Sequence, residues 1–184
     1  MAWLEKLENN NRPIRYWCQD ETRLGLKTIE RKQITAFGVK PLGKVQWEFV
    51  AYYLDGIVEP STGDNFFLEF SHLDSKCFQF FLNEVSRYSP HRLNIIQLDQ
   101  GKFHQSNDLK VPENILLLFQ PAASPELNPI ERLWQYIKDK LSWKLYDKLD
   151  QLKEEVREIL KGISSETIAS VTSWNYILEA VTVT

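Results

Sequence analysis

The run NILLLF at residues 114–119 limits the possible folds of this chain more than any other feature, because it is apolar after its first residue. A strand without polar alternation has no face for water, so both of its faces must be covered. The run LNIIQLD at residues 93–99 is also mostly apolar and lies one polar loop earlier. We therefore expect a sheet that is covered on both faces by other elements.

The order of the other segments predicts how that sheet is built. Strands are expected at residues 14–20, 45–54, 65–70, 93–99 and 114–119. Apolar residues at helical spacing predict helices over residues 73–85, 127–141 and 149–163, and another from Ser164 or Ser165 to Trp174. Three leading strands, a crossover helix and further strands favour an α/β fold, a mixed sheet flanked by helices. The ribonuclease-H-like fold has this order of elements.

Composition excludes several classes of protein. The 184 residues are enough for one domain with a substantial core. Cys18 and Cys77 form no C-x-x-C pair, which argues against a zinc site or a disulfide framework. No basic-then-apolar leader opens the chain, and charges interrupt every apolar run short of membrane-spanning length. These observations predict a cytoplasmic protein without a membrane partner.

Charge is distributed unevenly along the chain. The net charge of −3 argues against indiscriminate binding to nucleic acid. Residues 22–47 nevertheless contain one acidic residue, Glu30, against six basic ones: Arg23, Lys27, Arg31, Lys32, Lys40 and Lys44. A solvated surface segment explains this stretch without function, and a DNA-binding strip is the functional interpretation.

Three acidic residues occupy similar local settings. Asp20 ends the apolar run IRYWCQD, Asp99 ends LNIIQLD, and Glu131 opens the helical segment LNPIERLWQYIKDKL. If the three side chains converge, their oxygens form a ligand set suited to Mg²⁺ or Mn²⁺. Two such ions, roughly 3.5–4 Å apart, are a common means of breaking and rejoining phosphodiester bonds.

Each of these residues also has an explanation without catalysis. Asp20 and Asp99 can cap turns after their strands. The segment NPIE at residues 128–131 fits an N-cap, a first-turn proline and the acid of a capping box, which would account for Glu131. His104 is expected either to contact a phosphate at the edge of the site or to be a surface histidine.

Taken together, these segments resemble the catalytic domain of mariner-like DDE transposases, a superfamily that includes bacterial insertion-sequence enzymes. The most specific part is FQPAASPELNPIERLWQYIK at residues 119–138. It is similar to the family's block of a strand, a proline-rich turn and an ELNPIE-type helix start with a tryptophan one turn on. LDQGKFHQS is similar to the second-aspartate motif, and the DET of CQDET resembles the first.

The resemblance implies a ribonuclease-H-like catalytic domain at residues 14–145. Residues 1–13 would be an N-terminal remnant or linker, and residues 146–184 C-terminal helices packed on the same domain. Asp20, Asp99 and Glu131 would be the catalytic residues and would bind two Mg²⁺ or Mn²⁺ ions when DNA is bound. The implied reaction is cleavage of DNA at transposon ends and their joining to target DNA, by a homodimer in the DNA complex.

Three departures from the family pattern bear on this expectation. Asp99 and Glu131 are 32 positions apart, slightly closer than is usual in the family. Gln100-Gly101 stands where the family usually has Asn and a small residue. Family members usually carry helix-turn-helix modules before this domain, whereas residues 1–13 precede it here, so we expect this chain to lack the end-recognition module. Two alternatives stay open: a ribonuclease-H-like nuclease or resolvase that cuts without strand transfer, and a non-catalytic transposase remnant.

Overall fold

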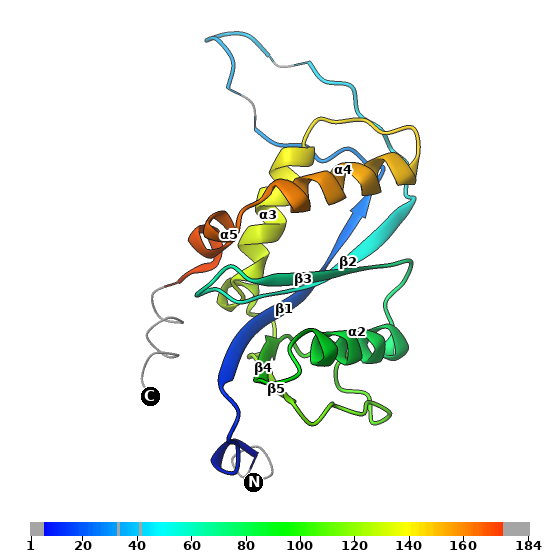
Figure 1. Cartoon of the computed structure of the whole chain (residues 1–184). Helices are drawn as coiled ribbons and strands as arrows, with labels where there is room; N and C mark the ends of the chain where they lie inside the picture. Colours follow the sequence, from blue (N-terminus) through cyan, green and yellow to red (C-terminus); the bar gives the residue numbers. More distant parts are fainter. Residues whose placement is uncertain (1–5, 33, 41, 175–184) are drawn as a thin grey trace.

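The structure, a computed structural model, describes residues 6–32, 34–40 and 42–174 and is built around one mixed sheet (Figure 1). The sheet has five strands in the order β3-β2-β1-β4-β5. They are β1 (Ile14–Gly25), β2 (Ala51–Val58), β3 (Asn65–Phe70), β4 (Leu93–Leu98) and β5 (Ile115–Phe119). The first three are antiparallel neighbours, while β4 runs parallel to β1, and β5 runs parallel to β4. The predicted α/β fold is confirmed.

Helices cover both faces of this sheet. Helix α2 (Ser75–Tyr88) lies on one face, and α3 (Ile130–Leu141), α4 (Leu149–Gly162) and α5 (Ser165–Thr172) lie on the other (Figure 1). Side chains alternate along β1, so Trp17 joins the core beneath α2 while Cys18 joins the core beneath α3 and α4. No helix in the described ranges is both long enough and apolar enough to cross a bilayer.

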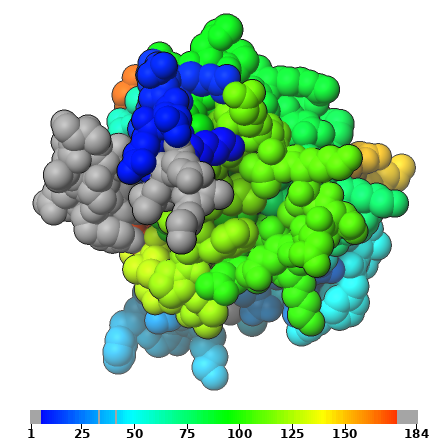
Figure 2. Space-filling view, turned by 90° about the horizontal axis from the view of Figure 1, so that it is seen from below, coloured from blue at the N-terminus to red at the C-terminus, as the bar shows by residue number. Residues whose placement is uncertain are grey.

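Three strand limits differ from the prediction by several residues. Strand β1 continues past residue 20 to Gly25, and β2 spans Ala51–Val58 rather than residues 45–54. The two strands pair from Cys18 opposite Val58 to Gly25 opposite Ala51. The alternating residues before Ala51 belong instead to the segment between Gly25 and Ala51. This segment, which we call the arm, projects from the body of the molecule (Figures 1 and 2). The apolar side chains of residues 45–50 face solvent, so their alternation does not mark a buried strand face.

The strand register places the carboxyl end of β4 beside the middle of β1. The last parallel pair joins Cys18 to Gln97. Asp20 lies two residues after Cys18, and Asp99 lies two residues after Gln97, so both acids occupy corresponding positions on neighbouring strands. The predicted domain limits at residues 13 and 145 stay a prediction, and residues 1–5 and 175–184 lie outside the described part of the chain.

Candidate active site

Asp20 lies on the α3 side of the sheet and is held by that helix. Asp20 lies two residues after Cys18 on β1, so the two side chains are on the same face of the sheet. Its Oδ2 accepts a hydrogen bond of 2.9 Å from Nε1 of Trp134. The Trp134 ring is buried against Phe67, with 5.9 Å between the ring centroids. Gly56 makes room for this contact, since a Cβ atom there would come within 2.9 Å of the Trp134 ring. The absence of a side chain at residue 56 therefore helps to fix the donor that holds Asp20.

Glu131 lies in the first turn of α3, as predicted, but it does not close a capping box. The residue preceding the helix is Pro129, and no side chain caps the helix start. The Asn128 side chain is buried and donates instead to the carbonyl oxygen of Gln19 on β1, at 2.8 Å. Within the described residues, the Glu131 carboxylate has no hydrogen-bond or salt-bridge partner. The capping explanation is wrong, because the asparagine ties α3 to β1 rather than to its own first turn.

The pKa values of Asp20 and Glu131 are both raised, and charges within the predicted set of acids contribute to each shift. Burial raises the pKa of Asp20 well above its ordinary value, and the charges of Glu21 and Glu131 raise it further. Burial also raises the pKa of Glu131, against the lowering effect of Lys138, and the charge of Asp99 adds to the increase. Glu131 is thus the member of the set that interacts electrostatically with both aspartates, which follow neighbouring strand positions.

Asp99 follows β4 directly and has one oxygen engaged by the protein. Its Oδ1 accepts from the backbone N–H of Gly101 at 2.7 Å and lies 2.8 Å from Nδ1 of His104. The side chain is half exposed. The predicted turn chemistry is therefore present, and it leaves the second oxygen of Asp99 available.

His104 is not a surface residue. It is 2% exposed and lies beneath α2, where its ring contacts Phe78 and Phe103. Its Nε2 atom is 2.9 Å from Oε1 of Glu21. Burial acts to lower the pKa of His104, but Glu21 and Asp99 outweigh it, and the pKa is raised above its usual value. The surface interpretation is wrong, because these carboxylates supply the polar partners that allow the ring to be buried.

Sequence reasoning did not assign roles to several residues around these acids. Glu21 faces away from Asp20 because strand neighbours alternate, and this much could be read from the adjacent pair. Asp55 lies directly opposite Glu21 in the β1–β2 ladder, and Gln19 donates to both carboxylates. Asp55 directly follows the predicted strand at residues 45–54, the same local setting as Asp99, but its pairing with Glu21 depends on a strand register that the sequence did not specify.

The three predicted acids form an open set rather than a closed cage. Their ligand oxygens do not all lie within 4.8 Å of one another, and the one set of three His, Cys or acidic residues that does so among the described residues is His72, Asp74 and Cys77. The donors of the open set are all carboxylate oxygens, which suit hard divalent cations. A cation would also offset the carboxylate charges that add to the effect of burial in raising the pKa values of Asp20 and Glu131.

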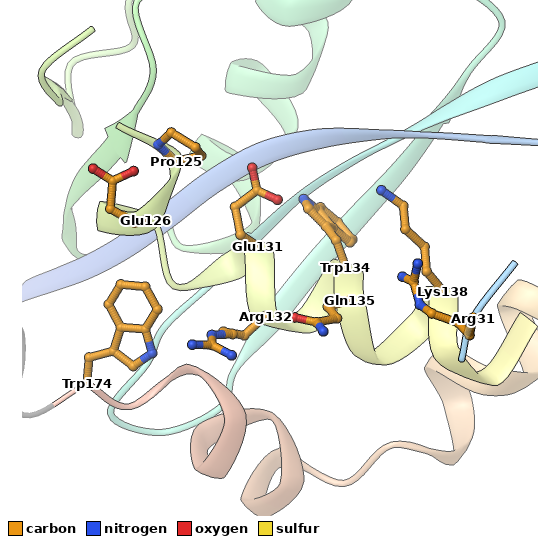
Figure 3. A pocket seen from close by; sticks show the side chains of 9 residues that line it. All are labelled: Arg31, Pro125, Glu126, Glu131, Arg132, Trp134, Gln135, Lys138 and Trp174. Carbon is orange, nitrogen blue, oxygen red and sulfur yellow. The ribbon is translucent and has the colours of Figure 1, made fainter. Parts of the chain in front are cut away.

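A pocket of ≈ 510 Å³ opens beside Glu131 (Figure 3). Glu131 and Trp134 point from α3 toward β1, and three cationic side chains line the same pocket: Arg31, Arg132 and Lys138. Arg31 comes from the basic stretch and bonds to Asp139 of α3 at 2.5 Å. An anionic ligand would thus meet positive charge next to the unpaired glutamate.

The basic side chains of residues 22–47 are exposed, although apolar residues at the start of this stretch, such as Leu24 and Leu26, are buried. All six of its predicted residues lie on the surface, namely Arg23, Lys27, Arg31, Lys32, Lys40 and Lys44. Arg23 donates to the carbonyl oxygen of Phe49 at 2.9 Å, and the Lys27 ammonium lies 4.5 Å from the centroid of the Trp47 ring. The structure therefore leaves these cations accessible but does not by itself assign them a ligand.

Comparison with known proteins gives consistent matches. The model of the family described as DDE superfamily endonuclease matches residues 15–153. A Sinorhizobium fredii protein, the uncharacterized protein y4pE/y4sA, is 36% identical over 102 residues, which are 54% of this chain and 76% of that protein.

Solved structures of Mos1 transposase share the fold. The Mos1 paired-end complex with the left transposon end has a TM-score of 0.66 at 15% identity, covering 93% of this chain and 55% of that one. The Mos1 mariner paired-end complex with Mn has a TM-score of 0.65 at 18% identity, covering 86% and 51%. This chain thus spans about half the length of the Mos1 chains that it matches. The fold is ribonuclease-H-like, and the protein belongs to the DDE superfamily endonuclease family.

Proposed function

We propose that this chain is the catalytic part of a DDE transposase that cleaves DNA strands and transfers them to a target. The observation that carries the proposal is the placement of Asp20 and Asp99 at corresponding positions on neighbouring strands, with Glu131 pointing toward β1 from the first turn of α3. Membership of the DDE endonuclease family and the fold shared with Mos1 transposase support the assignment.

Asp20, Asp99 and Glu131 would hold two Mg²⁺ or Mn²⁺ ions when DNA is bound. The all-carboxylate donor set supports this choice, as do the Mos1 paired-end complexes with Mn and with Mg. Such ions, when bound, activate a water or hydroxyl nucleophile and stabilise the leaving oxygen. The protein's own contribution is to hold the ligands: Trp134 orients Asp20, the tie from Asn128 to β1 sets the start of α3, and Gly101 and His104 orient Asp99.

The proposed partner is DNA, both the transposon ends and the target. Phosphates would approach through the pocket beside Glu131, where Arg31, Arg132 and Lys138 can neutralise charge. The exposed cations Lys32, Lys40 and Lys44 would extend the contact along the arm. We further propose a homodimer in the DNA complex and a cytoplasmic site of action.

Substitution of Glu131 tests the proposal directly. Glu131→Gln removes one ligand charge from a side chain that has no partner within the described residues. We therefore expect Mn²⁺-dependent cleavage of supercoiled plasmid DNA, a substrate that needs no end-recognition module, to be abolished, while the midpoint of thermal unfolding stays near that of the wild type. Glu126→Gln is the matched control, because Glu126 lines the same pocket but is exposed and was not assigned to the metal site.

The products of the same assay separate the alternatives. Cleavage followed by joining to a second DNA supports the transposase, while cleavage without joining would identify a nuclease or resolvase. A wild-type protein with no metal-dependent cleavage, or a Glu131→Gln variant that cleaves as well as the wild type, would contradict the proposal.

A further inference from the structure

The Asp99 carboxylate is oriented by more than a turn. The N–H of Gly101 already satisfies the ordinary two-residue turn, at 2.7 Å from Oδ1. The same oxygen also faces Nδ1 of His104 at 2.8 Å. Both donors bond to Oδ1, and Oδ2 has no hydrogen-bond partner within the described residues. The carboxylate is thus held through one oxygen while the other is left for a ligand.

His104 is itself fixed from its other side. Its Nε2 lies 2.9 Å from Oε1 of Glu21, an oxygen that also accepts from Nε2 of Gln19 at 2.6 Å. Gln19 in turn donates to Oδ1 of Asp55 at 2.9 Å. The result is a continuous chain of polar groups from Asp99, beyond the end of β4, through β1 to the interior of β2.

Burial of these linked polar side chains costs free energy unless each of them is hydrogen-bonded. His104 is 2% exposed, Gln19 1% and Asp55 1%, and the histidine ring packs against both Phe78 and Phe103. Placing several ionisable groups in such a setting is unfavourable unless they are paired with good geometry. An apolar residue at position 104 would fill the space beneath α2 without this cost. The turn after β4 therefore does not require the histidine.

The loop backbone is shaped around the same hydrogen bond. A Cβ atom at Gly101 would lie 3.0 Å from Nδ1 of His104 and 3.1 Å from Oδ1 of Asp99. A side chain at residue 101 would therefore press on both partners. The preceding Gln100 does not enter the site, because its amide nitrogen donates to the carbonyl oxygen of Gln120 at 2.9 Å. Although Gln100 departs from the family pattern, Gly101 keeps a small residue next to the hydrogen bond between His104 and Asp99.

We propose that His104 is a positioning residue that sets the Asp99 carboxylate for cation binding and is anchored on β1 by Glu21. It acts through Asp99 and touches neither cation nor DNA. The role rests on the proposed function, since it presupposes that Asp99 is a metal ligand. Partners of ligating side chains typically alter metal affinity by 10–100-fold when they are removed.

Two amide substitutions separate the two ring nitrogens. An asparagine amide nitrogen lies near the position of Nδ1 of a histidine, and a glutamine amide nitrogen lies near that of Nε2. His104→Asn can therefore still donate to Asp99, while His104→Gln keeps only the bond to Glu21. For each variant of the 184-residue chain, the Kd for Mn²⁺ is measured by electron paramagnetic resonance of the free ion, and the thermal unfolding midpoint is measured alongside.

We expect His104→Gln to weaken Mn²⁺ binding by about 10–100-fold and His104→Asn to remain close to the wild type, although both lose one buried bond. Asn114→Ala is the control for stability, because Asn114 is a buried polar residue that bonds to Ser86 and Ser89, away from Asp99. It should lower the unfolding midpoint without changing the Kd.

Three results would overturn the inference. Wild-type Kd values in both His104 variants would show that the histidine does not orient Asp99. Equal weakening in both variants, shared by Asn114→Ala, would show that metal binding only follows stability. A wild-type Mn²⁺ affinity that neither Asp20→Asn nor Asp99→Asn reduces would instead refute the proposed metal site, and the role of His104 with it.

Discussion

Asp55 shows how a single buried carboxyl group can set the pH dependence of this protein. It lies opposite Glu21 in the β1–β2 ladder and is 1% exposed. Burial raises its pKa well above the ordinary value, and the charges of Glu21 and Asp20 add to the effect, against the lowering hydrogen bond from Gln19. Like charges directly opposite on a sheet repel, so the pair favours a protonated Asp55.

The raised pKa predicts a pH-dependent effect of Asp55→Asn. The folded state binds this proton more tightly than the unfolded state, so the stability it contributes is present below the ordinary pKa of about 3.9 and is lost as the pH rises through the raised value. Asparagine keeps the acceptor for Gln19 without the charge. We therefore expect the variant to gain free energy of unfolding relative to the wild type between pH 4 and pH 8.

Urea denaturation across that pH range, in chelator, measures the difference. Asp108→Asn is the control, since Asp108 is exposed in the loop after β4. A difference between Asp55→Asn and the wild type that stays constant with pH would contradict the buried-proton explanation.

At the scale of elements, the position of α3 against β1 determines the geometry of the candidate site. Trp134 and Asn128 both bond across this contact, one to Asp20 and the other to the Gln19 carbonyl. The helix carries Glu131 on the same side as Trp134 (Figure 3). A shift of α3 would therefore move one candidate ligand and release the donor of another.

Gly56→Ala is expected to disturb this position of α3 against β1. The added Cβ would clash with the Phe67 ring and lie 2.9 Å from the Trp134 ring, so one ring must move. Overpacking of this kind costs about 1–3 kcal/mol. Chemical denaturation should show the loss, and Mn²⁺ affinity should fall with it.

Gly162→Ala provides the comparison, because a Cβ atom at that position at the end of α4 meets nothing within 4 Å. It should leave both stability and Mn²⁺ affinity near the wild type. If Gly56→Ala behaved in the same way, the close approach of β2 to α3 would not be what holds Trp134 in place.

At the scale of the whole molecule, charge is segregated despite the net value of −3. The cations of residues 22–47 are exposed on and near the arm, whereas Glu21, Asp55 and the three candidate ligands gather around the sheet. DNA binding by this protein would therefore depend on a local basic surface rather than on overall attraction.

The salt dependence of DNA affinity tests that surface. In the combined variant Lys32→Ala, Lys40→Ala and Lys44→Ala, the slope of log Kobs against log salt should become shallower by about 0.9 for each phosphate contact that is lost. Fluorescence anisotropy with a duplex at several salt concentrations gives the slope. Removing three exposed cations elsewhere, Lys76, Arg92 and Lys110, changes the net charge equally and should leave it nearly unchanged. Equal slopes in both variants would contradict a dedicated strip.

Local pattern by itself determined the elements and the candidate ligands. Apolar runs and helical spacing predicted the five strands and the helices, and the ends of those segments singled out Asp20, Asp99 and Glu131. These features depend on residues close together in the chain, which is why the sequence carries them. The start of β2 was misplaced because alternation of apolar residues looks the same on a buried strand and on an exposed arm.

Tertiary structure alone decided which neighbours these residues have. The parallel register of β1 and β4 puts Asp20 and Asp99 on corresponding positions, and Asn128 bonds to β1 although its local sequence fits a helix cap. His104 is buried because Glu21, 83 residues away in the chain, supplies its partner. Strand register and burial arise from contacts between distant segments, and no local pattern of residue types specifies them.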